Sequence, residues 1–248
     1  MNARKGASGV PLVGLLGWEA GHEDTLSQLE QMAGNIAHPN TFDFPVIFKR
    51  VKGAYYQTVV VQPNDRVLEA MIQAARELEQ EGIRAITTSC GFNAIFQREL
   101  ANAVGIPVFA SSLLQVPLVH RMLKVGQSVG IITANEECLT EQHLEGAGIT
   151  RTIPVAIRGV EATGEFSKIH ADPNAVLDVD RFQAEVVGVA RALVGEARDI
   201  GAIVLECTDL PPIAGAIRRA LGLPVFDIVT LTNMVYEAVA GEKWSCAV

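Results

Sequence analysis

The sequence predicts an α/β protein of two similar domains, each a parallel four-stranded sheet flanked by helices, related by pseudo-twofold symmetry. Short apolar runs that end in turn residues alternate with helical patterns, as in βαβ units. The run that ends at Cys207 has a second copy that ends at Cys90, and the copies align without a gap at an offset of 207 − 90 = 117 residues. The recurring residues also include Gly105, Pro107, Val108 and Phe109, which reappear as Gly222, Pro224, Val225 and Phe226.

The repeat extends to the start of each half-chain, where Val13-Gly14-Leu15-Leu16 corresponds to Val129-Gly130-Ile131-Ile132. A chain of 248 residues is long enough for two domains of ordinary size. We therefore expect a first domain at 10–125 and a second domain at 126–228. A C-terminal helix within 229–248 should pack back on the first domain.

The elements of the first half follow from apolar runs, capping residues and glycines. Strands are expected at 11–16, 45–51, 84–89 and 107–110, and helices at 25–36, 65–81, from 90 to 103 and from 112 to 124. Asn64 or Asp65 can cap the second of these helices, and Gly82 can end it. The strand at 45–51 ends near Lys49, Arg50 and Lys52, and Arg50 and Lys52 are candidates for binding a carboxylate.

The second half repeats this order. Strands are expected at 128–133, at 152–157, before Cys207 and at 224–226, and helices up to 145, at 179–198, at 211–221 and at 230–239. The segment 159–178 shows little periodicity. A loop of that length is either a lid over a cleft or an inert excursion, and both interpretations stay open.

The composition excludes several classes of partner. Acidic residues outnumber basic residues by 28 to 20 and no Lys/Arg-rich run occurs, so neither nucleic acid nor a membrane is expected as a partner. No apolar stretch reaches the roughly 18 residues of a membrane span, and residues 1–9 lack the apolar segment of a signal peptide. We expect a soluble, cytoplasmic protein. Four cysteines without Cys-x-x-Cys spacing predict reduced thiols rather than disulfides or a zinc site.

Cys90 and Cys207 are the candidate reactive residues, because each follows a buried strand in a duplicated unit. Ligands of such units bind at the carboxyl ends of the strands, so both thiols should face one cleft. A thiol at the amino end of a helix has its pKa lowered from ~8.5. One thiolate and one thiol on opposite sides of a substrate carbon, roughly 7 Å apart, can remove a proton from one face and return one to the other.

Other residues near the two thiols are candidates for binding the substrate. Backbone N–H groups near Gly91 and Thr208 could stabilise charge on a carboxylate. Asp209 either orients the Cys207 thiol or a bound amino group, or it caps the following helix, and Asn93 has the same ambiguity beside Cys90. The histidines show no metal-ligand spacing and no lysine has the context of a pyridoxal Schiff base, so no cofactor and no metal are expected.

Two stretches resemble the aspartate/glutamate racemase superfamily, whose members are independent of pyridoxal. The segment Cys207-Thr208-Asp209-Leu210-Pro211 is similar to the pattern Gly-Cys-Thr-Glu-hydrophobe-Pro, and Val13-Gly14-Leu15-Leu16-Gly17 resembles the first strand and glycine turn. The resemblance covers about 10–239. It implies Cys90 and Cys207 as the acid/base pair, a cleft between the domains, no cofactor and a homodimer.

The chain also departs from this family pattern. The family usually has Cys-Asn-Thr where this chain has Cys90-Gly91-Phe92. Many members have Ala-Thr and a further Thr after the first strand of the second domain, where this chain has Thr133-Ala134-Asn135-Glu136. Smaller residues are expected at the positions of Trp18 and Glu19. These changes bear on the substrate rather than on the fold. The substrate-binding residues that we expect are Gly17, Trp18, Glu19, Arg50, Lys52, Gly91, Phe92, Asn93, Asn135, Arg158, Thr208 and Asp209.

The sequence thus predicts a cofactor-independent racemase or epimerase that acts on a small carboxylate. The proton exchanged is the one on the carbon α to the carboxylate, in an amino acid such as aspartate or glutamate or an analogue. A related decarboxylase, a hydantoin racemase and a maleate-type cis-trans isomerase stay open as alternatives. A carboxylate-binding sensor without catalysis is the alternative from another class.

Overall fold

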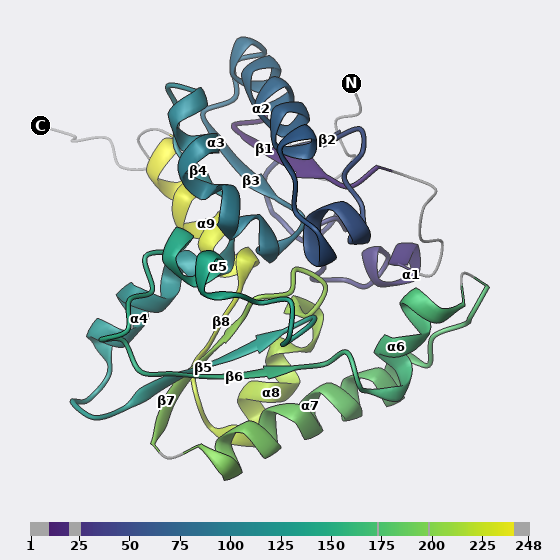
Figure 1. Ribbon diagram of the computed structural model, residues 1–248. Helices are drawn as coiled ribbons and strands as arrows, with labels where there is room; N and C mark the ends of the chain where they lie inside the picture. Colours follow the sequence, from purple (N-terminus) through teal and green to yellow (C-terminus); the bar gives the residue numbers. More distant parts are fainter. Residues whose placement is uncertain (1–9, 20–25, 173, 198, 241–248) are drawn as a thin grey trace, which may run out of the picture.

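The computed structural model describes residues 10–19, 26–172, 174–197 and 199–240, which form two four-stranded sheets flanked by helices (Figure 1). The first sheet has the order β2-β1-β3-β4 and the second the order β6-β5-β7-β8, and all pairs of neighbours are parallel. The strands are β1 (Val13–Gly17), β2 (Val46–Arg50), β3 (Ala85–Thr88), β4 (Val108–Phe109), β5 (Ser128–Thr133), β6 (Val155–Gly159), β7 (Ile200–Leu205) and β8 (Val225–Phe226). The predicted α/β fold class with two equivalent parallel sheets is confirmed.

Helices cover both faces of each sheet, which explains why the central strands read as continuous apolar runs. The helices are α1 (Leu26–Glu30), α2 (Asp65–Gln80), α3 (Gln97–Ala103), α4 (Val116–Met122), α5 (Glu141–Gly146), α6 (Gly164–Ala171), α7 (Val179–Glu196), α8 (Ala214–Leu221) and α9 (Ile228–Val239). Shorter helical turns are η1 (Gln57–Val61), η2 (Gly91–Phe96), η3 (Ser112–Gln115) and η4 (Pro211–Ile213). The Asn64 side chain caps α2 by accepting a hydrogen bond from the Val67 N–H. Every residue of β1, β3 and β7 is buried.

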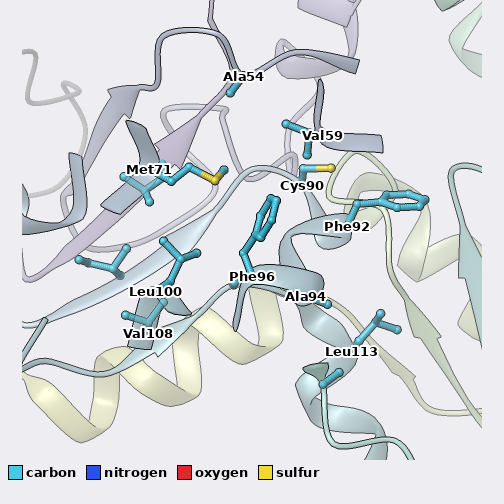
Figure 2. Packing of buried hydrophobic residues seen from close by; sticks show 14 of the residues in the cluster. Ala54, Val59, Met71, Cys90, Phe92, Ala94, Phe96, Leu100, Val108 and Leu113 are labelled. Carbon is cyan, nitrogen blue, oxygen red and sulfur yellow. The ribbon is translucent and has the colours of Figure 1, made fainter. Parts of the chain in front are cut away.

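One hydrophobic cluster joins the two sheets. It contains Ile86 and Phe92 from the first half together with Val129, Ile131 and Val204 from the second. Figure 2 shows part of this cluster around Cys90, with Val59, Phe92 and Phe96 nearby. The two halves of the chain therefore share one hydrophobic core.

The C-terminal helix α9 follows the last strand of the second sheet and returns to the first. Its residues Ile228 and Leu231 are buried with Val13 and Leu15 of β1. The Tyr236 ring stacks on Phe44 with centroids 3.5 Å apart. Residues 241–248, the rest of the predicted C-terminal segment, lie outside the described part of the chain.

Two predicted elements differ from the structure. The helix expected at 25–36 is described only as α1, and the chain then turns at Gly34, whose φ of +96° is not helical. The segment 159–178, expected to be irregular, contains α6. The buried Glu165 carboxylate holds this helix, because it binds Lys168 Nζ at 2.7 Å and accepts the Asp178 N–H at 3.0 Å.

Across the described residues, no helix has the length and apolar character needed to span a membrane.

Candidate functional site

A cavity lies between the two sheets, at the carboxyl ends of their central strands. It is lined by Trp18, Glu30, Asn35, Ile36, Ala37, Tyr56, Val60, Ser89, Cys90, Gly91, Phe92, Ala134, Phe166, Ile169, Glu206, Cys207, Thr208 and Asp209. Most of these residues follow β1, β3, β5 or β7, and the others come from α1 and the loop after it, from η1 and the residue before it, and from α6. The ends of parallel strands are where doubly wound units bind ligands.

Both predicted reactive thiols line this cavity. Cys90 follows β3, Cys207 follows β7, and each is 7% exposed. The cysteines that the structure describes, Cys90, Cys138 and Cys207, are all free of disulfide bonds. The structure therefore brings one thiol from each half of the chain to the same cavity.

The turn that carries Cys90 is organised by Thr88. The Cys90 N–H and the Asn93 side-chain amide both donate to Thr88 Oγ1, at 3.4 and 3.0 Å. Cys90 then occupies the N-cap position of η2 with an extended backbone, as a thiol at a helix start requires. Asn93 thus supports the turn and does not line the cavity.

The environment of Cys207 differs from the prediction. We expected Cys207 at a helix start that lowers its pKa, but the next helical turn, η4, begins only at Pro211. Burial, and then the charges of Asp209 and Glu206, raise the pKa of the Cys207 thiol well above its ordinary value. A negative charge on Cys90 raises it further. Cys207 is therefore a thiol rather than a thiolate in the ligand-free protein.

Asp209 contacts this thiol and caps no helix. Its Oδ2 lies 3.9 Å from Cys207 Sγ, and its Oδ1 accepts a hydrogen bond from Asn35 Nδ2 at 2.7 Å. Burial raises the pKa of Asp209 to about 7, the Asn35 hydrogen bond opposes this shift, and the Glu30 charge adds to it. Of the two roles considered for Asp209, the geometry matches orientation of the thiol.

Glu206 is a cavity residue that the sequence analysis missed. It is 0% exposed, and its Oε2 accepts from Thr133 Oγ1 at 2.8 Å and from the Ala134 N–H at 3.4 Å. Burial raises the pKa of Glu206 to about 7, and the Asp209 charge contributes to the same direction. The available signal was a carboxylate at the end of an apolar run, directly before Cys207.

The cations predicted to bind a carboxylate do not line the cavity. Arg50 donates to the Trp18 carbonyl at 2.9 Å and to Glu30 at 3.3 Å, and Arg158 pairs with Glu196. Both arginines end outer strands of their sheets, where an acidic neighbour neutralises them, and Lys52 is exposed in the turn after β2. None of the three lines this cavity, so their role in substrate binding stays a prediction.

Three other predicted residues, Gly17, Glu19 and Asn135, are not among those that line the cavity. The Glu19 carboxylate accepts the Gly53 N–H at 2.8 Å, and Asn135 donates to the Tyr56 hydroxyl at 3.1 Å. A side chain at Gly17 would meet the Phe48 ring at 2.1 Å, so this glycine serves packing. Trp18, Gly91, Phe92, Thr208 and Asp209 do line the cavity, and the Thr208 hydroxyl donates to the Ser89 carbonyl of the first half.

The lining has an unusual balance of charge. Four aromatic side chains and three carboxyl groups contribute to it, namely Trp18, Tyr56, Phe92 and Phe166 and Glu30, Glu206 and Asp209. No lysine or arginine is among the lining residues that the structure describes. Among all residues that the structure describes, no group of His, Cys, Asp or Glu side chains is arranged to hold a metal ion.

Comparisons with known proteins give the chain its relatives. It is 32% identical over 221 residues to dimethylsulfoniopropionate lyase 6 of Emiliania huxleyi (strain CCMP1516), an alignment that covers 83% of this chain and 56% of that protein. It is 27% identical over 205 residues to dimethylsulfoniopropionate lyase of Durusdinium sp. clade D, covering 80% and 67%. The chain thus spans little more than half the length of the first of these relatives.

Solved structures show the same fold. A mutant of arylmalonate decarboxylase in a sulfate-associated form matches with a TM-score of 0.62 at 22% identity, covering 96% of this chain and 97% of the other. Allantoin racemase from Pseudomonas fluorescens matches with a TM-score of 0.64 at 16% identity, covering 92% and 90%. A model of the Asp/Glu/Hydantoin racemase family matches residues 13–233. The chain therefore belongs to the Asp/Glu/hydantoin racemase family.

Proposed function

We propose that this protein is a lyase that removes the proton α to a carboxylate and expels a β-sulfonium group. The substrate class is a small sulfonium carboxylate of the dimethylsulfoniopropionate type. Relatives with that activity in their names support the proposal, although they are longer than this chain. In this proposal the two-sheet fold is common to the family, and the residues that line the cavity select the substrate.

The observation that carries the proposal is the lining of the cavity. Aromatic faces attract a cation with about 0.5–2 kcal/mol each, and an ionised Asp209 adds direct charge attraction. A second carboxylate, as in aspartate or glutamate, would be repelled by an ionised Asp209 and would find no lysine or arginine among the described lining residues. A sulfonium is compact, cationic and weakly hydrated, so it suits this wall.

The thiols supply the base. Since Cys207 is held as a thiol, we assign Cys90 as the group that takes the α-proton. The C–H electrons form the Cα=Cβ double bond, the Cβ–S bond breaks, and its electron pair leaves with sulfur as neutral dimethyl sulfide. The other product is acrylate, and the proton on Cys90 passes to solvent before the next turnover.

A panel of substrates in deuterated water tests this proposal. The purified chain is incubated with dimethylsulfoniopropionate, and dimethyl sulfide and acrylate are followed by proton NMR. Equal amounts of both products, above those formed in the presence of the Cys90→Ser variant, support the lyase. No product above that control overturns it.

Racemisation is the second candidate, because thiols from both halves of the chain line one cavity. The amino-acid racemase predicted from the sequence stays a prediction. Deuterium at the α-carbon of aspartate, glutamate or a hydantoin, with loss of optical rotation, would support it in the same panel. Release of CO₂ from an arylmalonate would instead indicate a decarboxylase, and binding without turnover a sensor.

A further inference from the structure

We infer that Glu206 binds the substrate carboxylate as a neutral carboxylic acid, donating a hydrogen bond from Oε1, and that Gly91 makes room for it. The inference deepens the proposed function and rests on it in taking the ligand to be a carboxylate. It supplies the anion-binding group that neither Arg50 nor Arg158 provides in this structure.

The two oxygens of Glu206 have different surroundings. Oε2 accepts hydrogen bonds from Thr133 Oγ1 and the Ala134 N–H. Oε1 is buried and has no hydrogen-bond partner, and Glu206 lines the cavity. An ionised carboxylate would leave an anionic oxygen buried and unpaired, which is costly. A neutral acid with its proton on Oε1 instead offers one donor to a ligand in the cavity.

Gly91 faces Glu206 across the boundary between the two halves. A Cβ atom at position 91 would lie 2.2 Å from Glu206 Oε1 and 2.3 Å from its carbonyl oxygen. Gly91 also lines the cavity, directly after Cys90. Position 91 must therefore be glycine for both the backbone and the carboxyl group of Glu206 to lie where they do.

When Glu206 is neutral, Asp209 is the ionised carboxylate of the pair. Asp209 and Cys207 on the same loop interact with Glu206, Cys90 of the first half lines the same cavity, and Glu30 on α1 acts on Asp209. Both oxygens of Asp209 receive donors, from Asn35 and from the Cys207 thiol, as suits an ionised carboxylate. Asp209 thus attracts the cationic end of the substrate and Glu206 binds its anionic end.

Two probes that cannot react separate these roles. One is trimethylammoniopropionate, which has a trimethylammonium group in place of the dimethylsulfonium group, and the other is its isostere in which an uncharged tert-butyl group replaces the trimethylammonium group. Binding of each to the full chain is measured by calorimetry from about pH 6 to about pH 9. The enthalpy in buffers of different ionisation enthalpy gives the protons taken up on binding.

For the parent chain we expect affinity for both probes to fall by up to about tenfold per pH unit above pH 7, with uptake of a proton. The Glu206→Gln variant keeps a donor at the same place, so its affinity for both probes should no longer fall above pH 7 and its binding should lack that proton uptake. Glu206→Ala should bind about tenfold or more weakly at low pH. Asp209→Asn is the matched control: it should keep the pH dependence of binding the tert-butyl probe and lose the preference for the trimethylammonium probe.

A Glu206→Gln variant with the same pH profile and proton uptake as the parent would overturn the inference. Because Gln is nearly isosteric, this result does not depend on whether Glu206→Ala folds. Release of dimethyl sulfide by the parent combined with that result would leave the proposed function standing. If the Glu206 variants show the expected pH profiles but the parent releases no dimethyl sulfide, the inference stands and the proposed function is overturned.

Discussion

The Asn35 side-chain amide donates a 2.7 Å hydrogen bond to Asp209 Oδ1, and this bond joins the two halves of the chain beside the cavity. The other oxygen of Asp209 lies 3.9 Å from Cys207 Sγ. A residue of the first half therefore acts on the thiol of the second half through a carboxylate.

Replacing Asn35 by Ala should destabilise the protein more at about pH 8 than at about pH 5. At the higher pH Asp209 is ionised and loses a donor worth about 1–3 kcal/mol, whereas at the lower pH it is protonated and loses less. Urea unfolding at both pH values measures the difference. Asn35 also accepts the Ala37 N–H, but that bond is lost equally at both pH values. An equal loss of stability at both would contradict an ionised Asp209.

The stability of the parent chain should fall as the pH rises from about 4 to about 7. Glu206 has a pKa of about 7 when folded, but unfolded glutamates titrate near 4, so between these values the folded chain holds more protons. Rising pH then favours the unfolded chain, by an order of 2–4 kcal/mol for this carboxyl. The Glu206→Gln variant should lack that part of the decline in a urea series. A parallel decline in both proteins would assign the effect elsewhere.

Gly91→Ala should cost about 1–3 kcal/mol of stability, because the new Cβ atom would overlap Glu206 Oε1 and its backbone oxygen. Gly188→Ala is the matched control. Gly188 lies inside α7 with nothing within 4 Å of the place that a methyl group would take, so alanine there should stabilise the helix by about 0.5–1 kcal/mol. Thermal or urea unfolding compares the two. Similar effects of both substitutions would show that position 91 tolerates a side chain.

Gln28→Ala should loosen the segment that carries α6. The Gln28 amide donates to the Ala175 carbonyl at 2.7 Å and accepts the Leu177 N–H at 3.1 Å, so one side chain ties α1 to the chain after α6 (Figure 1). Since Phe166 and Ile169 on α6 line the cavity, substrate affinity should fall while the chemical step is spared. Hydrogen exchange should rise across 164–177, and KM should rise more than kcat falls. Unchanged exchange there would show that the tie is dispensable.

The strands were predictable because buried parallel strands appear in the sequence as apolar runs, and the duplication gave the position of each thiol twice. The two arginines were expected at the cavity and lie elsewhere for a physical reason. The sequence pattern around a cation at the end of a strand does not show whether the side chain faces a ligand or pairs with a remote carboxylate. In the structure Arg50 pairs with Glu30, and Arg158 pairs with Glu196.

Residues brought in from distant segments were beyond the sequence pattern. Asn35 and Tyr56 reach the cavity from loops, and Phe166 reaches it from a helix held by the Glu165 network. Glu206 differs, because its position beside Cys207 was visible. A glutamate that ends a buried run is normally interpreted as the return to solvent, and only the geometry shows it fully buried.

Release of dimethyl sulfide from dimethylsulfoniopropionate, compared among three proteins, tests the central claim most directly. The proteins are the parent chain, Cys90→Ser, and Cys138→Ser as a matched control at a half-buried cysteine that does not line the cavity. We predict release by the parent and by Cys138→Ser at similar rates, and a rate lower by about a hundredfold or more for Cys90→Ser. Equal release by all three proteins, or none by the parent, would contradict a thiol-based elimination in this cavity.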